Sequence, residues 1–267
     1  MNNLKMFKEL MDIFITAPID FSYLKFKVPM KQMDNKLVTG YLIKSALNNG
    51  SYRKSTTDIS YTKLKKSFEK ILCNRYKKRN KLSLISQNFI INKYAHQYNQ
   101  SVLLNSIKNL EIYHRNFVER EKEIDENLIR DKEIVLKFIN NNIQDKNNIE
   151  KFERNINYDP ELTLYNRLLE LFGNLNEELL KKLLRTSSEV SNKEIKTFSY
   201  KLVNTRNYYT HGDSKISKDM VIKDNYELIE TTTFINQIIK YYICKELFDL
   251  DDEIIEIITK GMVGVIK

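Results

Sequence analysis

The sequence predicts an all-α protein built from long helices and preceded by a small segment of mixed α and β character. The 267 residues include only 6 Gly and 3 Pro, so residues that break helices are scarce. Apolar residues recur at helical spacing over most of the chain from about residue 60 onward. With 42% hydrophobic and 30% charged residues, the composition is typical of a globular protein and not of a disordered one.

The N-terminal part, residues 1–58, is predicted to be a mixed extension. Residues 1–15 place apolar side chains at helical spacing, whereas residues 21–28 alternate as a strand does. The stretch Asn48-Asn49-Gly50-Ser51 is a turn signal and is followed by polar residues. We therefore expect the boundary of the helical domain, residues 59–267, shortly after this turn.

The helical domain is predicted to contain a series of helices that differ in length. Each one is indicated by an apolar stripe with polar residues on the opposite side. The expected helices cover residues 60–79, 82–120, 123–143, 160–173, 191–211 and 219–247, with a further short helix after a loop at 145–148. No internal repeat or low-complexity tract is present.

The net charge of the protein indicates which kinds of binding partner are favoured. A charge of +9 favours polyanions such as RNA, DNA or an anionic membrane surface. The first helix of the domain concentrates this charge on one side, through Lys65, Lys66, Lys70, Arg75, Lys77, Lys78 and Arg79. That side is either an ordinary solvated face or a surface that follows an RNA backbone, and the sequence leaves both alternatives open.

The sequence lacks the signals that are typical of several classes of protein. Cys73 and Cys244 form no disulfide framework or CxxC pair and are expected to be ordinary thiols. No signal peptide or apolar run of about 20 residues appears, which predicts a cytoplasmic protein with no membrane role. Zinc-binding clusters, phosphate-binding loops and nucleophile elbows are missing as well, so we expect no metal and no cofactor.

The predicted helix over 191–211 carries the residues best suited to chemistry. Ser191 and Glu194 fit a capping box at its start, and Gly212 suits the left-handed residue after its end. Near that end lies Arg206-Asn207-x-x-x-His211, in which Asn207 and His211 are four residues apart and share a helix face. The alternative interpretation is a surface Arg followed by a His that caps the helix.

These residue types suit the cleavage of RNA through its own 2′-hydroxyl group. A guanidinium binds a phosphate through two hydrogen bonds, and an imidazole transfers protons near neutral pH. Because the substrate supplies the nucleophile, the protein need only position the RNA, move protons and stabilise charge. Arg206 would bind the scissile phosphate, His211 would act as general acid and base, and Asn207 would orient either group.

The stretch Thr205-Arg206-Asn207-Tyr208-Tyr209-Thr210-His211-Gly212 resembles the Arg-x4–6-His signature of the HEPN superfamily. Residues 101–117, which end in a Glu-x-x-His-Arg pattern, are similar to a helix of ApeA-type HEPN domains, and residues 162–171 resemble the segment that precedes the motif helix in that family. The three segments follow one another in the family's order over residues 60–250. Residues 1–55 fall outside the resemblance, where ApeA proteins usually carry a β-rich domain.

The resemblance implies a HEPN-type helical bundle that forms a homodimer, with one motif from each subunit in a composite cleft. It implies a metal-independent endoribonuclease that leaves 2′,3′-cyclic phosphates and acts in abortive infection, anti-phage or toxin-type defence, with an antitoxin or a phage-derived trigger as a further partner. Glu111 and Arg115 match the second segment and would support the site, unless they form only a surface ion pair. Tyr208 and Tyr209 would stack on a base, or lie in the core.

Two alternatives remain at this point. One is a non-catalytic module that keeps the HEPN fold and binds RNA or a protein through its basic surface. The other is a helical dimerisation protein with no role in nucleic-acid binding. The intact Arg206, Asn207 and His211 favour the ribonuclease, because a scaffold requires none of them.

Overall fold

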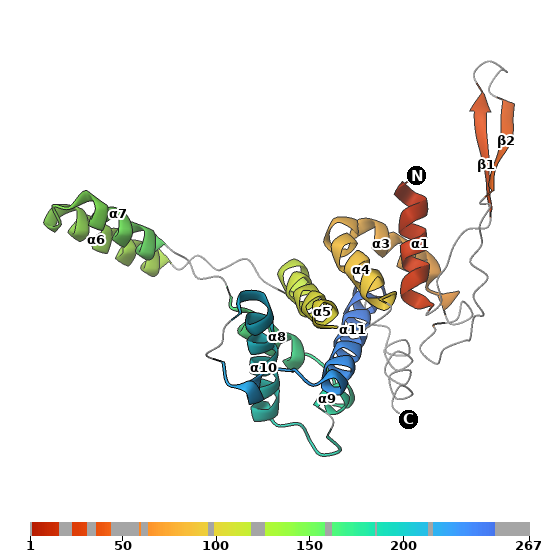
Figure 1. Cartoon of the computed structure of the whole chain (residues 1–267). Coiled ribbons are helices and arrows are strands. Elements are labelled where there is room, and N and C mark those ends of the chain that lie inside the picture. Colours follow the sequence, from red (N-terminus) through yellow and green to blue (C-terminus); the bar gives the residue numbers. More distant parts are fainter. Residues whose placement is uncertain are drawn as a thin grey trace.

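The computed structural model describes residues 2–15, 23–30, 36–43, 59, 64–95, 99–118, 126–157, 162–184, 186–212 and 216–248. Within these ranges the chain is mostly helical (Figure 1). The elements are α1 Asn2–Phe14, β1 Tyr23–Met30, β2 Lys36–Ile43, α3 Phe68–Lys77, α4 Arg79–Lys93, α5 Gln100–Tyr113, the π-helical turn η2 His114–Val118, α6 Glu126–Asn142, α7 Lys146–Asn157, α8 Leu164–Gly173, α9 Glu177–Leu184, α10 Asn192–His211, the 3-10 turn η3 Lys218–Met220 and α11 Asn225–Phe248. In the ranges described, every helix falls short of the length and apolarity that crossing a bilayer requires.

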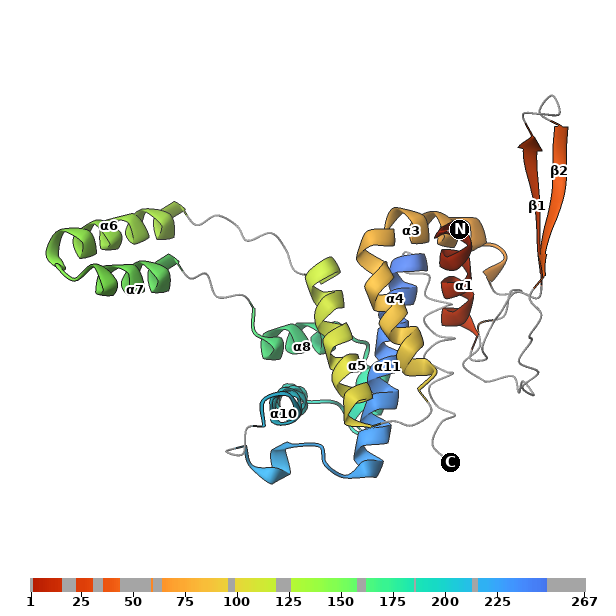
Figure 2. The same cartoon turned by 45° about the horizontal axis from the view of Figure 1, so that its top comes forward.

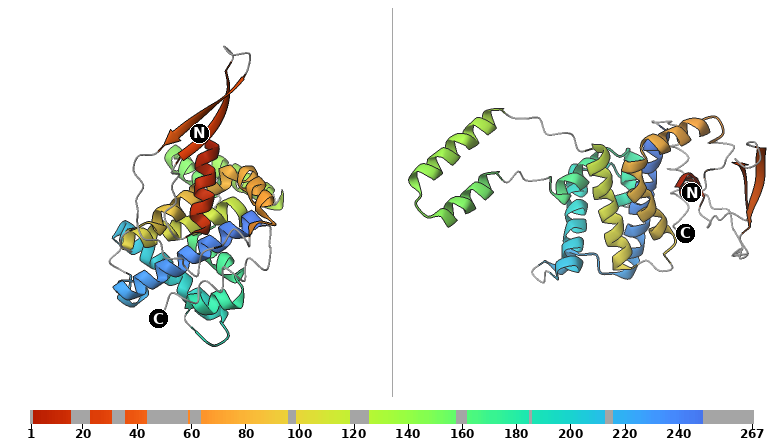
Figure 3. Two further views of the ribbon diagram at one scale, coloured as in Figure 1. Left: turned by 90° about the vertical axis from the view of Figure 1, so that its right-hand side faces the viewer. Right: turned by 90° about the horizontal axis from the view of Figure 1, so that it is seen from above.

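Helix α11 is the centre of the bundle. It packs against α3, α4, α5 and α9, and most of its residues between Leu228 and Phe248 are buried. A helix that is apolar on nearly all sides must be surrounded by other elements, because exposing any face would leave apolar surface in water. Helix α5 lies beside α11, with α10 and α8 on its other side (Figures 2 and 3).

Polar side chains link α4, α5 and α11 inside the core. Nδ2 of Asn92 donates to Oγ of Ser106 at 2.9 Å and lies 3.3 Å from Oδ1 of Asn236, while Nδ2 of Asn105 donates to Oδ1 of Asn92 at 2.7 Å. Buried amides require such partners, since an unsatisfied polar group in the core is costly. These bonds fix the register of α5 against its neighbours.

A second link joins the C-terminal end of α11 to the ends of α5 and α3. The Tyr113 hydroxyl donates to Oε1 of Glu246 at 2.8 Å, and Nζ of Lys78 contacts Oε2 of the same carboxylate at 2.9 Å. Burial, followed by the Glu246 carboxylate, raises the pKa of Tyr113 well above its usual value, so the phenol stays protonated as a donor.

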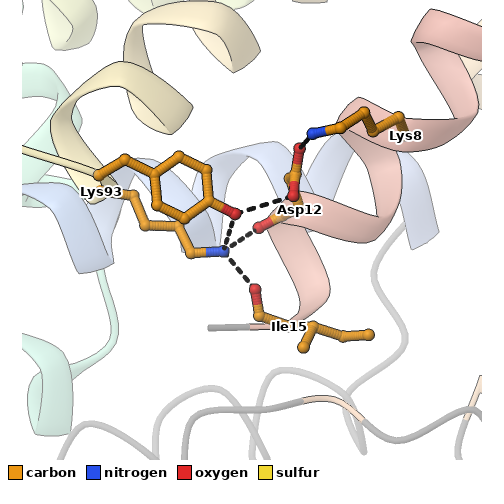
Figure 4. A network of polar contacts seen from close by, with 5 residues as sticks. Lys8, Asp12, Ile15 and Lys93 are labelled. Atoms are coloured by element: carbon orange, nitrogen blue, oxygen red, sulfur yellow. Dashed lines mark hydrogen bonds and ion pairs between the residues drawn. The ribbon is translucent and has the colours of Figure 1, made fainter. Parts of the chain in front are cut away.

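Helix α1 belongs to the helical core and packs on α4. Lys93 of α4 donates to the backbone oxygens of Asp12 and Ile15 at the C-terminal end of α1, as Figure 4 shows. A cation at this end satisfies orphan carbonyls and complements the helix dipole. Nearby, Arg75 is 1% exposed and donates to Oε2 of Glu9 at 2.8 Å.

Strands β1 and β2 form an antiparallel hairpin in which Tyr23 pairs with Ile43 and Met30 with Lys36. The strand predicted over residues 21–28 overlaps β1, which extends past Pro29. Such a position is open to Pro because a two-stranded sheet consists of edge strands. The division of the chain at residues 58 and 59 stays a prediction.

Helices α6 and α7 pack on each other and stand apart from the rest of the bundle in Figures 1 and 2 and in the right-hand view of Figure 3. Ile139 is buried between them, and Nδ2 of Asn140 donates to Oε1 of Glu153 at 2.9 Å. Acidic and basic residues are interspersed along both helices. The predicted helix over 123–143 corresponds to α6, and the predicted short helix to α7.

The prediction of one helix over 82–120 is wrong. The chain forms α4 and α5, which pack against each other as separate helices. Asn99 caps α5, since its side chain accepts from the Val102 N–H at 3.2 Å. The apolar stripe continues through the break because both helices face the same core, so periodicity alone does not reveal the break.

The structure differs from the sequence prediction at two further helices. Helix α9 was not predicted, although Asn176 caps it by accepting from the Leu179 N–H at 2.9 Å. The last long helix begins at Asn225 and not at residue 219, because Asp224 caps it and the short turn η3 comes before it. In both cases the cap residue is visible in the sequence as Asn or Asp ahead of an apolar run.

Helix α10 has the boundaries that the sequence predicts. Ser191 accepts from the Glu194 N–H at 3.3 Å, and the Glu194 carboxylate accepts from the Ser191 N–H at 2.8 Å, so the capping box is confirmed. Gly212 follows the last residue with φ 65° and ψ 30°, and its N–H donates to the Tyr208 carbonyl at 3.0 Å. The helix therefore ends at His211.

The two glycines at helix ends should respond oppositely to alanine. We expect Gly212→Ala to lower the free energy of unfolding by about 1–2 kcal/mol, because the left-handed backbone strains any residue with a Cβ. Gly173→Ala on α8 is the matched control: the added methyl group meets open space, and no positive φ is required. It should raise stability by up to about 1 kcal/mol. Urea unfolding of both variants checks this, and equal effects would contradict the assigned backbone of Gly212.

Candidate ribonuclease cleft between α5 and α10

The rotation of α10 about its axis is fixed by its contacts with the segment that follows it. Oγ1 of Thr205, a fully buried residue, donates to the Lys201 carbonyl at 2.7 Å and accepts from the Ile222 N–H at 3.0 Å. The Tyr209 hydroxyl donates to the Ile222 carbonyl at 3.2 Å. Both polar groups of the buried Ile222 peptide are therefore satisfied by α10, as burial requires.

With Thr205 directed into the core, the neighbouring residues Arg206 and Thr210 face α5. They line a cleft of about 390 Å³ between the two helices. Residues from α5 complete it, namely Leu104, Asn105, Ile107, Lys108 and Glu111. The structure thus brings together Arg206 and Glu111, which the sequence assigned to separate segments.

The lining of the cleft combines charged and apolar side chains. Arg206 and Lys108 supply cations, Glu111 supplies a carboxylate, and Leu104 and Ile107 are apolar. The guanidinium on α10 and the ammonium group on α5 together form a site that attracts phosphate, since each donates charge-assisted hydrogen bonds. Oε1 of Glu111 also pairs with Nη2 of Arg115 at 3.2 Å on the outer face of the helix.

Asn207 and His211 lie outside the residues that line the cleft. Nη1 of Arg206 approaches Oδ1 of Asn207 at 3.5 Å, the outer limit of a hydrogen bond, so the amide restrains the guanidinium weakly. His211 is exposed at the end of α10, directly after Thr210 of the cleft wall. Its side chain is accessible to solvent.

The two tyrosines of the motif differ in their surroundings. Tyr209 is anchored by its hydrogen bond to Ile222 and so supports the loop after α10. Tyr208 packs edge-on against Tyr209 and lies under Nζ of Lys223, 4.0 Å from the ring centroid. This cation–π contact places Lys223, a residue that the sequence analysis did not single out, beside the motif.

A hydrogen-bonded chain that begins in the core and ends at the exposed Glu170 joins the two other segments on which the family resemblance rests. Nη1 of Arg167 on α8 lies 3.2 Å from Nδ1 of His114, and Nε2 of His114 lies 2.7 Å from Oε2 of Glu170. A guanidinium has only donors, so Nδ1 accepts and the ring proton sits on Nε2, which donates to Glu170. Arg167 and His114 are fully buried, which gives both a structural role behind α5.

Lys108 and Thr210 are residues of the cleft that the sequence analysis missed. Thr210 lies inside the motif, next to His211, and Lys108 stands three residues before Glu111, on the same face of α5. Helical spacing from Glu111 would have pointed to Lys108. No local signal in the sequence indicates that α10 lies across the cleft from α5.

The remaining reactive groups lie elsewhere. Cys73 is exposed and Cys244 is buried, and both thiols are free. Burial raises the pKa of Cys244 to about 12, so this thiol is a poor nucleophile. Among the residues with a described position, no three His, Cys, Asp or Glu side chains gather as a metal site would require.

Comparison with known proteins identifies the family. The chain matches the family model described as Apea-like HEPN over residues 104–253, which is more than half of its length and runs from α5 through α11. No curated protein and no solved structure gives a match. The matched region includes both walls of the cleft, the Arg167–His114–Glu170 chain and the motif at Arg206 to His211. The chain belongs to the Apea-like HEPN family.

Proposed function

We propose that this protein is a metal-independent endoribonuclease whose site is the cleft between α5 and α10. The observation that supports it best is the convergence of Arg206 and Glu111 on one cleft, with Lys108 in the same lining and the exposed His211 directly after Thr210 in the chain. The two cations that face each other across the cleft suit a phosphodiester, and membership of the HEPN family points to a nuclease or a defence-related function. The net charge of +9 favours the same polyanionic substrate.

The proposed reaction needs no nucleophile from the protein. The 2′-oxygen of the RNA forms a bond to phosphorus and the bond from phosphorus to the 5′-oxygen breaks, leaving a 2′,3′-cyclic phosphate and a 5′-hydroxyl. One imidazole accepts the proton of the 2′-hydroxyl, and a protonated acid delivers a proton to the departing oxygen. Arg206 and Lys108 would stabilise the negative charge that builds on the phosphate oxygens.

The position of His211 is consistent with a site that two subunits complete. The ring is exposed at the end of α10, and Asn207 lies outside the cleft lining. In a homodimer with the two α10 ends facing each other, each cleft would gain the second subunit's His211. This arrangement is part of the proposal and supplies separate groups for the acid and base steps. RNA cleavage of this kind fits abortive infection or toxin-type defence, with an antitoxin or phage-derived trigger as regulator.

Removal of either motif side chain should abolish cleavage without unfolding the protein. We expect Arg206→Ala and His211→Ala each to lower the cleavage rate at least about 100-fold, because each removes a group that acts on the transition state. Purified protein and cellular RNA are incubated in EDTA, and the ends of the products are mapped. Lys196→Ala, which removes an exposed cation from the same helix, is the control and should cut at the wild-type rate.

Cleavage that persists in pure His211→Ala protein would contradict the assignment of the acid–base group. Salt-dependent RNA binding with no cleavage at any protein concentration would favour the non-catalytic binding module instead. Arg206→Lys separates the two effects of the guanidinium, since lysine retains the charge but not the two parallel hydrogen bonds.

Glu111 can be tested with little risk to stability. Its pair with Arg115 is an exposed i,i+4 contact, which contributes about 0.5 kcal/mol or less. We expect Glu111→Gln to leave the Tm almost unchanged while it alters the cleavage rate at least severalfold. Glu177→Gln breaks a similar pair with Lys181, at 2.8 Å on α9, and should change neither quantity. Equal rates for both variants would remove Glu111 from the site.

A further inference from the structure

A dense group of exposed cations in the described part of the helical bundle lies outside the family match, which begins at residue 104. Between Leu64 and Lys81, along α3 and the start of α4, Glu69 is the one acidic residue. The exposed cations of this segment are Lys65, Lys66, Lys70, Lys77, Arg79 and Lys81. Two further basic residues of this segment are Arg75, which is buried on Glu9, and Lys78, which is paired with Glu246.

Part of this charge adjoins the helix that forms the cleft. Nδ2 of Asn116, directly after α5, donates to the Lys81 carbonyl at 2.8 Å, and Nζ of Lys81 lies 5.7 Å from the Phe117 ring. In Figure 2 the C-terminal end of α5 lies next to the junction of α3 and α4. Asn116 and Phe117 of η2 thus hold Lys81, near the start of α4, beside the C-terminal end of α5.

Helix α5 continues the line of charge to the cleft. Lys108, Glu111 and Arg115 follow each other at spacings of three and four residues, so they lie along one face of α5 and η2. Lys108 lines the cleft and Arg115 is exposed one to two turns further on. Lys108, Arg115, Lys81, Arg79 and Lys77 therefore form a cationic track from the cleft to the α3–α4 junction.

We infer that the cationic track binds the backbone of single-stranded RNA that extends from the cleft. This inference rests on the proposed function and specifies how the substrate is held beyond the scissile phosphate. A phosphodiester chain carries one negative charge at each nucleotide, so a row of spaced cations recognises it whatever its sequence. The α6–α7 hairpin lacks this property, because its lysines and arginines alternate with Glu and Asp.

The test compares two triple variants that change net charge equally. Lys77→Glu/Arg79→Glu/Lys81→Glu removes the far part of the track, and Lys137→Glu/Lys146→Glu/Lys151→Glu places the same charges on the hairpin. Both are made in full-length His211→Ala protein, so that the RNA is not cut during the measurement. A fluorescent 20-nucleotide RNA and a 4-nucleotide RNA, chosen to engage the cleft without reaching the far part of the track, are the probes, and titrations are repeated over a range of salt.

We expect the track variant to bind the long RNA at least tenfold more weakly, with the salt slope reduced by about 2, and the short RNA as before. The hairpin variant should bind both within twofold of its parent. Equal losses in the two variants, or no loss in the track variant, would overturn the inference. So would a loss of binding to anionic phospholipid vesicles without a loss for RNA. The corresponding Gln variants and their Tm values distinguish altered binding from altered folding.

Failure of the inference and failure of the proposed function give different results. Track-dependent RNA binding in a wild-type protein that never cuts RNA would retain the track and reject the ribonuclease. Normal cutting of long RNA by a protein with the track charges reversed would retain the ribonuclease and reject the track.

Discussion

The orientation of α10 is the constraint on which the cleft depends. Successive residues of a helix point about 100° apart, so fixing one side chain fixes the direction of the next. Thr205 and Tyr209 bind the two polar groups of the Ile222 peptide, which directs this side of α10 into the protein. Arg206 and Thr210 are then presented to α5. A rotation of the helix would break buried hydrogen bonds, and for this reason the guanidinium has a defined place.

The opposite wall of the cleft, helix α5, is held in position by its contacts with α4, α8 and α11. Helix α5 is held by buried amides against α4 and α11, and by Tyr113 through Glu246. The Arg167–His114–Glu170 chain fastens its C-terminal continuation to α8. Rigid elements on both sides keep a site at a constant width, which helps a catalytic group act on a phosphate. The two helices are thus held in place by contacts outside the cleft, and the charged side chains of the cleft are not needed to position them.

Much of the motif helix could be predicted from sequence, because its signals are local. The capping box at Ser191 and Glu194 and the left-handed Gly212 each depend on residues within one turn. The break between α4 and α5 was not predicted, since a continuous apolar stripe hides it and the Asn99 cap is a weaker signal. The meeting of Glu111 and Arg206 depends on packing between helices far apart in the chain. Only the family resemblance suggested it, and no periodicity does. Lys108 differs, because its spacing of three residues from Glu111 is a local signal that would have indicated it.

The central claim is that the cleft cuts RNA through the substrate's own 2′-hydroxyl, and one substitution in the RNA tests it most directly. A short RNA with a single mapped cleavage position is compared with the same RNA carrying a 2′-deoxynucleotide on the 5′ side of that position. The account predicts that wild-type protein in EDTA cuts the first and leaves the second intact at that position. Equal cleavage of both would show that the nucleophile comes from elsewhere and would contradict the assigned chemistry.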